Sequence, residues 1–333
     1  MMMNNEPTII VVVPMRNEAW VLEAFLTCTS SWADYIILAD QHSEDGSREI
    51  AARFEKVILV DNDAAEMNQA AARLLLFKEV DKIPGDKIVM ALDADEFLSE
   101  GFDKTEGWRR ILRSKPNELF CFRWLNLYGD YSHAIPDNGF MEWGCHFSPN
   151  TKIADLYYQC EKRAVHEMRV PCVSEVSYVE IPDIRFVHLA RLNLTRQKNK
   201  EDFYQVSSVA KLKKSFSAVS AYRQYHHTNL LLNELDQEVF LYIKGTEADA
   251  KSLVRMDDYG RYYIDEMKAI FSRDGIDKYL KLDIWGNPYL NAAGICPKIP
   301  LKYKCFHSYL RKTQDKSNRK LVKLIDKLLK FIC

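Results

Sequence analysis

The first hundred residues alternate short apolar runs rich in β-branched side chains with segments of helical spacing. Thr8 to Val13 is a continuous β-branched run, which is typical of a strand buried on both faces. Similar runs predict strands at Tyr35 to Ala39, at Lys56 to Val60 and from Ile88 onward, and helical spacing separates them at Ala19 to Ser30 and Glu66 to Val80. Strands that alternate with helices predict an α/β fold with a mostly parallel, Rossmann-like sheet and helices on both faces.

Two carboxylates, Asp93 and Asp95, end the apolar run that starts at Ile88. In parallel α/β sheets ligands collect beyond the carboxyl ends of the strands, and hard cations such as Mg²⁺ or Mn²⁺ take carboxylate and phosphate oxygens. The spacing therefore favours a divalent cation that carries a diphosphate. A turn or a helix cap would also use aspartates here. An EF-hand calcium loop is excluded, because Leu98 stands where that loop needs glycine and Lys104 where it needs glutamate.

Polar residues also follow the first two predicted strands. Pro14, Asn17 and Glu18 come after the first strand, and Asp40 opens a segment after the second that runs to Ser47. A capped helix start and an ordinary turn remain alternatives for these two segments. Since the carboxyl ends of parallel strands meet at one edge of a sheet, we expect all three motifs at that edge. Such an edge fits a nucleotide-activated substrate.

The order of these motifs resembles the nucleotide-sugar half of family 2 glycosyltransferases, which have the GT-A fold. The motifs are Pro-x-x-Asn-Glu, then Asp-x-x-Ser-x-Asp-Gly-Ser, then Asp-x-Asp-Glu, each after a strand, and the resemblance covers residues 8 to about 100. It implies an inverting, metal-dependent transferase that uses a nucleotide sugar, most simply a UDP-sugar, with Mn²⁺ or Mg²⁺. It also implies site residues on the donor side: Asp40 at the uracil ring, Asp93 near the ribose, Asp95 on the metal, Pro14, Asn17 and Glu18 beside the nucleoside, and Asn68 on the helix after the third strand.

The second half carries a looser resemblance. Residues 162 to 167 resemble the Arg-x-x-His-Glu segment of family members that build the lipopolysaccharide core. Glu167 is then the candidate base for the acceptor hydroxyl, a role that contributes typically about 10²- to 10⁴-fold. His166 would orient that base or touch phosphate, and Arg163 would contact the donor. The resemblance also suggests that His188 completes the metal site of Asp95 and Asp93, although a lone histidine is often structural.

The organisation predicted from the sequence is a catalytic domain over residues 1–190, a helical region over 191–300 and a basic tail over 301–333. Residues 1–100 would form the nucleotide-sugar half and 101–190 the acceptor-side half. In the helical region the segment Asn229 to Ile243 is predicted to be a helix.

The basic tail holds ten Lys or Arg against two Asp, a local charge of +8, whereas the whole chain has −1. Residues 319 to 332 have the pattern of an interfacial helix, with lysines largely opposite an apolar face formed by Leu321, Leu324, Ile325, Leu328 and Ile332. Contact with an anionic membrane is predicted, and packing on the protein itself is the alternative.

The composition narrows the functional classes. The chain is 47% hydrophobic and 28% charged, and it has no run of the roughly 20 apolar residues that would cross a bilayer. We therefore expect a cytoplasmic protein, at the inner face of the cell membrane if the tail binds lipid. The expected acceptor is a glycan or a lipid-linked saccharide of cell-surface polysaccharide or lipopolysaccharide synthesis. Nucleic acid is not expected as a partner, because the basic patch has no recognisable binding motif.

Two alternative functions remain open. A nucleotidyltransferase would share the α/β sheet and the acidic metal site, but it would need a glycine-rich phosphate loop after the first strand. A non-catalytic, membrane-peripheral glycan-binding or scaffold protein would keep the fold and lose turnover.

Overall fold

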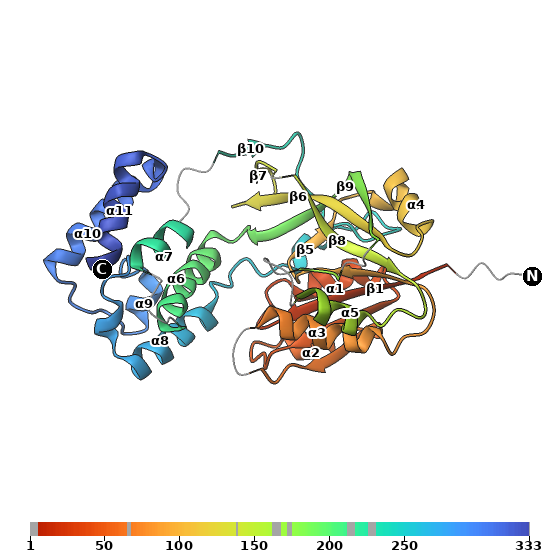
Figure 1. Ribbon diagram of the computed structural model, residues 1–333, viewed down its shortest axis with the longest axis horizontal. Coiled ribbons are helices and arrows are strands. Elements are labelled where there is room, and N and C mark those ends of the chain that lie inside the picture. Colours follow the sequence, from red (N-terminus) through yellow and green to blue (C-terminus); the bar gives the residue numbers. More distant parts are fainter. Residues whose placement is uncertain are drawn as a thin grey trace, which may run out of the picture. The chain divides into compact units, whose positions relative to one another are not determined.

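A computed structural model of the chain describes residues 6–64, 68–137, 139–161, 168–171, 175–211, 217–225 and 231–332. The chain divides into two compact units, which are described separately (Figure 1). Unit 1 comprises Met1–Arg191 and Asn233–Met256, and unit 2 comprises Leu192–Leu232 and Asp257–Cys333.

Unit 1 is built on one mixed sheet. Its strands, among the residues that the structure describes, are β1 (Thr8–Met15), β2 (Tyr35–Asp40), β3 (Val57–Asp61), β4 (Lys87–Ala91), β5 (Glu96–Leu98), β6 (Glu118–Tyr128), β7 (His133–Ile135), β8 (Phe140–Phe147), β9 (Ser177–Arg191) and β10 (Asn233–Glu234). The strand order is β10-β7-β6-β8-β4-β1-β2-β3, and β9 pairs with β5 and β6. The helices of this unit are α1 (Leu22–Ser30), α2 (Ser47–Ala51), α3 (Gln69–Val80), α4 (Glu106–Leu112) and α5 (Ile153–Glu161).

The four strands of the N-terminal half are all parallel, as the alternation of strands and helices predicts. β1 pairs with β2 and β4, and β2 pairs with β3, each in parallel. Beyond β4 the strands are no longer all parallel. β8 is antiparallel to both β4 and β6, whereas β6 and β9 run parallel to each other. The α/β fold class predicted from the sequence is confirmed, and the antiparallel pairs involve the strands that follow β4, beginning with β5, which is antiparallel to β9.

Helices cover both faces of the parallel half. Ile10 and Val12 of β1 pack with α3 and α5 in one buried cluster, where the rings of Phe77 and Tyr157 lie 5.0 Å apart. Successive strand residues point to opposite faces, so the equally buried Val11 faces the other side. On that side α1 contacts β2 and β5. This explains why the first strand reads as a continuous apolar run rather than an alternating one.

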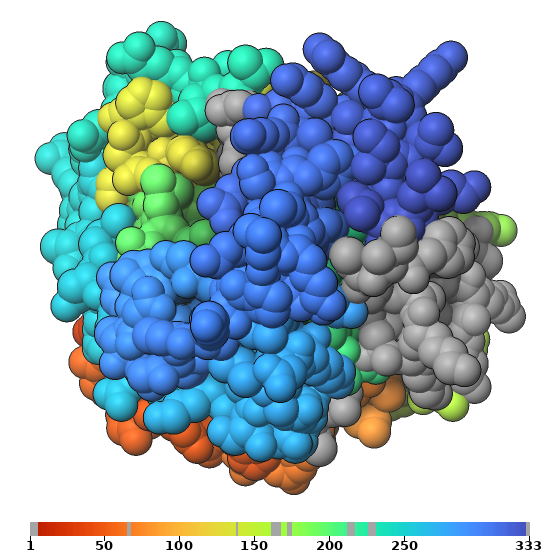
Figure 2. All heavy atoms as spheres, turned by 90° about the vertical axis from the view of Figure 1, so that its left-hand side faces the viewer, coloured from red at the N-terminus to blue at the C-terminus, as the bar shows by residue number. Residues whose placement is uncertain are grey.

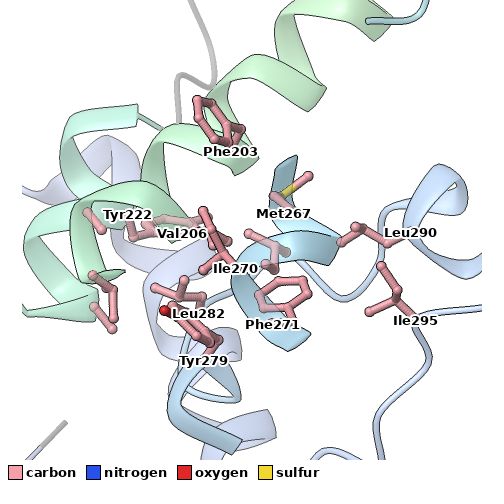
Figure 3. Packing of buried hydrophobic residues seen from close by; sticks show 14 of the residues in the cluster. Phe203, Val206, Tyr222, Met267, Ile270, Phe271, Tyr279, Leu282, Leu290 and Ile295 are labelled. Carbon is pink, nitrogen blue, oxygen red and sulfur yellow. The ribbon is translucent and has the colours of Figure 1, made fainter. Parts of the chain in front are cut away.

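Unit 2 is helical. Its helices are α6 (Leu194–Lys211), α7 (Ala218–Tyr225), α8 (Arg261–Asp274), α9 (Pro288–Ala292), α10 (Leu301–Thr313) and α11 (Lys320–Ile332). Their buried side chains form one cluster, in which Val206, Tyr222, Met267 and Phe271 come from three helices (Figure 3). A helical region after residue 190 was predicted. The apolar residues recur at helical spacing, so each helix has an apolar face that it buries in this shared core.

The helix predicted at Asn229 to Ile243 is not formed. Residues 226–230 lie outside the described residues, and residues 231–243 contain the short strand β10 instead of a helix. Asn233 and Glu234 pair with the edge strand β7, so a long-range backbone pairing overrides the local helical spacing.

The C-terminal helix α11 packs on unit 2 with a different face from the one predicted to be apolar. Val322 and Asp326 are buried, and Asp326 accepts hydrogen bonds from Arg223 of α7. Leu324 and Leu328 stay more than half exposed. Side chains of this C-terminal segment, dark blue in Figure 2, extend outward from the surface. None of the described helices is both long enough and apolar enough to span a membrane.

Candidate active site

The strand ends place the predicted motifs at one edge of the sheet. Met15, the last residue of β1, lies opposite Asp40, the last residue of β2, and Val12 lies opposite Ala91, the last residue of β4. The segments that begin after Met15, Asp40 and Ala91 therefore leave the sheet side by side. This follows from the parallel register alone.

The loops after β1 and β2 hold each other in place. Asn17 is buried and has a φ of 56°, a conformation that few non-glycine residues adopt. Its backbone N–H donates to Ser43 Oγ at 2.8 Å, and its side-chain oxygen accepts from the N–H of Glu44 at 2.8 Å. The N–H of Glu18 donates to Ser47 Oγ at 3.0 Å. The loop after β1 and the loop after β2 are thus joined by hydrogen bonds, which fix the shape of this loop pair.

Asp40 is completely buried beneath this loop pair. Its carboxylate accepts from the N–H of Ser43 and, at 2.7 Å, from Nη1 of Arg48. Arg48 also pairs with Asp61 at 2.8 Å, and its hydrogen bonds to Asp40 and Asp61 raise the pKa of the guanidinium. Asp40 therefore anchors the loop in this arrangement, with its carboxylate bound to Ser43 and Arg48.

Asn68 caps helix α3. Its side-chain oxygen accepts from the N–H of Ala71 at 3.0 Å, which is the usual role of an asparagine at this position. The residue is exposed, so the rest of its amide faces solvent.

The acidic segment lies between β4 and β5. The Asp93 carboxylate is 40% exposed and lies 3.2 Å from Nη2 of Arg169 and 3.9 Å from Nη2 of Arg73. Asp95 is largely buried, and its Oδ1 lies 3.6 Å from Nε2 of His188 on β9. The backbone carbonyl of Asp95 also accepts from the N–H of Leu189 at 2.9 Å. The structure thus brings Asp95 and His188, which are 93 residues apart in the sequence, to within 3.6 Å of each other.

Asn126 sets the protonation pattern of His188. The distance between Asn126 Oδ1 and His188 Nδ1 is 2.7 Å, and an amide oxygen can only accept, so Nδ1 carries the proton. In the neutral ring Nε2 then holds a lone pair, and this is the nitrogen that faces Asp95. The ring is further held by Trp124, which stacks on it with 5.1 Å between centroids and 13° between planes.

A largely buried ion pair between Glu96 and Arg169 adjoins the acidic segment. Glu96 is fully buried, and Arg169 donates to its two oxygens at 2.6 and 2.8 Å. The indole N–H groups of Trp124 and Trp143 and the N–H of Asp93 donate to the same carboxylate. Burial by itself would lower the pKa of Arg169, but the charges of Glu96 and Asp93 outweigh it and raise the pKa. Arg169 therefore stays charged.

The comparison with protein families assigns the N-terminal part of this site. The family described as Glycosyl transferase family 2 matches residues 10–115. This segment belongs to glycosyl transferase family 2. The match includes the loops after β1, β2 and β4, and it ends before His188 and Arg169. A family 2 domain supports a glycosyltransferase that uses a nucleotide sugar.

Comparison with solved structures finds several similarities at low sequence identity. One is to 4-diphosphocytidyl-2C-methyl-D-erythritol synthase from Anaerococcus prevotii, with 15% identity over 52% of this chain and 89% of that one, at a TM-score of 0.35. Another is to glucosyl-3-phosphoglycerate synthase from Mycobacterium tuberculosis in complex with Mn²⁺, uridine diphosphate and glucosyl-3-phosphoglycerate, with 17% identity, a TM-score of 0.27, and 37% of this chain and 44% of that one covered. A third is to a nucleotidyl transferase from Methanothermobacter, with 14% identity over 50% and 79% of the chains, at a TM-score of 0.31. No curated protein matches the sequence.

Donor atoms of Asp95, inside the family 2 segment, and of His188, outside it, suit a divalent cation. Among the described residues no group of three His, Cys, Asp or Glu side chains could hold a metal. Asp95 and His188 offer a carboxylate oxygen and an imidazole lone pair 3.6 Å apart. Cations such as Mg²⁺ and Mn²⁺ are often held by one or two protein ligands, with water and substrate phosphates completing the shell. The pair therefore fits a divalent cation that takes its remaining ligands from water or substrate.

Three predicted residues, Arg163, His166 and Glu167, lie outside the described residues. Five residues around Asp93, Asp95 and His188 were not predicted as site residues from the sequence: Arg73, Arg169, Glu96, Trp124 and Asn126. Only Glu96 carried a local signal, because it directly follows the Asp-x-Asp motif. The others come from α3, from β6 and from a segment after α5, and no sequence spacing links them.

Proposed function

We propose that the protein is an inverting, metal-dependent glycosyltransferase that moves a sugar from a nucleotide donor, most simply a UDP-sugar, to a glycan or lipid-linked acceptor. The observation that carries this proposal is the approach of Asp95 and His188 to 3.6 Å at the carboxyl edge of a family 2 domain. Asp93 lies two residues before Asp95 and faces the same edge, so one acid can meet the ribose while the other meets the metal.

The residues of the chain then have separate tasks. Asp95 and His188 would hold the cation, which supplies positive charge to the leaving diphosphate. The guanidinium groups of Arg73 and Arg169 flank Asp93 and keep this part of the edge from being purely acidic, which favours an anionic substrate. Glu167 is the proposed base that takes the acceptor proton as the hydroxyl attacks the anomeric carbon.

The two alternatives make different predictions. A nucleotidyltransferase would release pyrophosphate and would use glycine-rich backbone to cradle phosphates after β1. Here that loop is Pro14 to Glu18, and its N–H groups at Asn17 and Glu18 are already bound to Ser43 and Ser47. A scaffold protein would show no metal-dependent nucleotide binding.

The test is release of nucleoside diphosphate from a panel of UDP-, GDP- and dTDP-sugars with Mn²⁺. The wild type is compared with Asp95→Asn, His188→Gln and Glu167→Gln. We expect one donor to be hydrolysed slowly, with turnover lost in Asp95→Asn and reduced in the other two variants. Release of pyrophosphate from a nucleoside triphosphate and a sugar 1-phosphate in a parallel assay, with no nucleoside diphosphate released from any NDP-sugar, would favour the nucleotidyltransferase. An inactive wild type without Mn²⁺-dependent nucleotide binding would favour the scaffold.

A second part of the proposal concerns helix α11, which we propose binds an anionic membrane surface. Leu321, Leu324 and Leu328 are 68%, 57% and 58% exposed, although the helix packs on unit 2 through Val322 and Asp326. The exposed leucines recur at helical spacing and form a continuous apolar stripe. The four lysines of α11 are exposed as well. Near an anionic leaflet each basic residue contributes about 1 kcal/mol, so charge and apolar area would act together.

Vesicle co-sedimentation tests the membrane proposal. The full chain should sediment with vesicles that contain phosphatidylglycerol and much less with neutral phosphatidylcholine vesicles. Leu321→Ser, Leu324→Ser and Leu328→Ser combined should abolish the binding. Leu301→Ser is the control, because Leu301 is 76% exposed at the start of α10 and is not part of the stripe. Equal sedimentation of the triple variant and the wild type would contradict the proposal.

A further inference from the structure

Arg169 is a largely buried arginine whose guanidinium makes several polar contacts. Besides Glu96, it donates to the backbone carbonyl of Ala91 at 3.2 Å and to Asp93 Oδ2 at 3.2 Å. The indole rings of Trp124 and Trp143 lie 5.6 and 5.1 Å from it, within the range of cation–π attraction. Its planar fork of donors thus contacts the last residue of β4, the first acid and the first residue of β5.

These contacts fix both ends of the acidic segment. Ala91 precedes the segment and Glu96 follows it, and Arg169 binds both. Between these two points lie Asp93, which Arg169 also binds, and Asp95. The position of the Asp95 carboxylate therefore depends on a short connection whose ends are held by one guanidinium.

Arg169 also supports His188, through Trp124. The ring of Trp124 lies against the Arg169 guanidinium, stacks on the imidazole of His188 and donates its N–H to Glu96. Movement of the guanidinium would therefore displace the surface on which His188 rests. The two members of the candidate metal pair, Asp95 and His188, are positioned by the same buried charge.

Fold stability alone does not explain a buried ion pair of this kind. Desolvation of two charges offsets most of their attraction, and well-packed apolar side chains of similar volume are often as stabilising or more so. A planar, bidentate pair does provide geometric specificity, which a lysine cannot reproduce. The arrangement is therefore better suited to positioning than to holding the fold together.

We propose that Arg169 is a positioning residue for the transferase reaction, whose fork keeps Asp95 and His188 at the separation that one cation needs. This inference rests on the proposed function. It requires that the shape of the guanidinium matters as well as its charge. The matched comparison is Arg110, which makes the same bidentate contact with Glu118 at 2.7 Å for both bonds, on α4 and β6 at the surface.

The experiment compares Mn²⁺ binding in the presence of saturating UDP, measured by electron paramagnetic resonance, for the wild type, Arg169→Lys and Arg110→Lys. We expect Arg169→Lys to bind Mn²⁺ about tenfold to 100-fold more weakly, the range seen when outer-shell partners of metal ligands are changed. Turnover of the donor should fall at limiting Mn²⁺ and recover as Mn²⁺ is raised. Arg110→Lys should match the wild type in both measurements.

A second variant distinguishes loss of positioning from loss of folding. Arg169→Met combined with Glu96→Gln removes both charges together, so no unpaired charge is left buried, and its folding is checked by thermal unfolding. We expect it to fold and to bind Mn²⁺ as weakly as Arg169→Lys. Wild-type Mn²⁺ affinity in either variant would overturn the positioning role and leave the proposed function intact. Absence of Mn²⁺–UDP binding and of turnover in the wild type would overturn both.

Discussion

Replacing Asn126 by leucine should weaken metal binding at His188 without touching a metal ligand. The Asn126 oxygen accepts the Nδ1 proton of His188 at 2.7 Å and so leaves the lone pair on Nε2. Without that acceptor the proton can move to Nε2, where Asp95 Oδ1 at 3.6 Å would attract it. Loss of such an outer contact typically costs about 10- to 100-fold in metal affinity, or about 1.4 to 2.8 kcal/mol. Asn126 is only half-buried, so water can replace it in part, and we expect about tenfold.

The assay is Mn²⁺ titration by electron paramagnetic resonance with UDP at saturation. Asn126→Asp should keep the wild-type affinity, since a carboxylate also accepts the Nδ1 proton. Ser114→Ala is the matched control, because Ser114 Oγ contacts Nδ1 of His146 at 2.9 Å, and His146 pairs with Ile88 near the opposite end of β4. Equal Mn²⁺ affinities for Asn126→Leu, Ser114→Ala and the wild type would refute the tautomer argument.

Three further predictions concern groups away from the candidate metal pair. Burial raises the pKa of the Cys28 thiol to about 12, so iodoacetamide at pH 8 should alkylate the exposed Cys296 first, and equal rates by mass spectrometry would contradict this. Burial lowers the pKa of His146, so the unfolded chain binds the proton more tightly than the folded chain. The free energy of unfolding should therefore fall as pH drops below about 6.5, by at most about 1.4 kcal/mol per pH unit, and the melting temperature should fall with it. His146→Gln should reduce this pH dependence. Asp326→Ala leaves the largely buried Arg223 without its carboxylate, and about 3 kcal/mol should be lost in urea unfolding followed by circular dichroism, whereas a loss below about 1 kcal/mol would show that the remaining acceptors suffice.

The parallel half of unit 1 was predictable because its information is local. β-branched runs, the helices between them and the polar residues at strand ends all have short sequence signatures. Parallel pairing then brings the strand ends together without further information. The ranges observed for β1, β2 and β4 differ from the predicted ones by two residues or fewer at their starts.

The supporting shell was not predictable, because its contacts join distant parts of the chain. Arg169 is 73 residues from Glu96, and Asn126 is 62 residues from His188. No spacing links a guanidinium to a carboxylate over such a distance. The same reason explains the failed helix at Asn229 to Ile243, where pairing with β7 outweighs the local apolar pattern. It also explains α11, whose buried face depends on Arg223 of another helix.

The three acids of the Asp-x-Asp-Glu motif show how surroundings divide one local pattern into different roles. Glu96 is fully buried, and five donor contacts to its two oxygens occupy its lone pairs, which leaves it no capacity for a ligand. Asp93 is 40% exposed, but two arginines offset its charge. Asp95 faces His188 at 3.6 Å, across a gap that fits a shared cation better than a direct hydrogen bond. The sequence made Asp93 and Asp95 candidates for the metal, and the contacts favour Asp95.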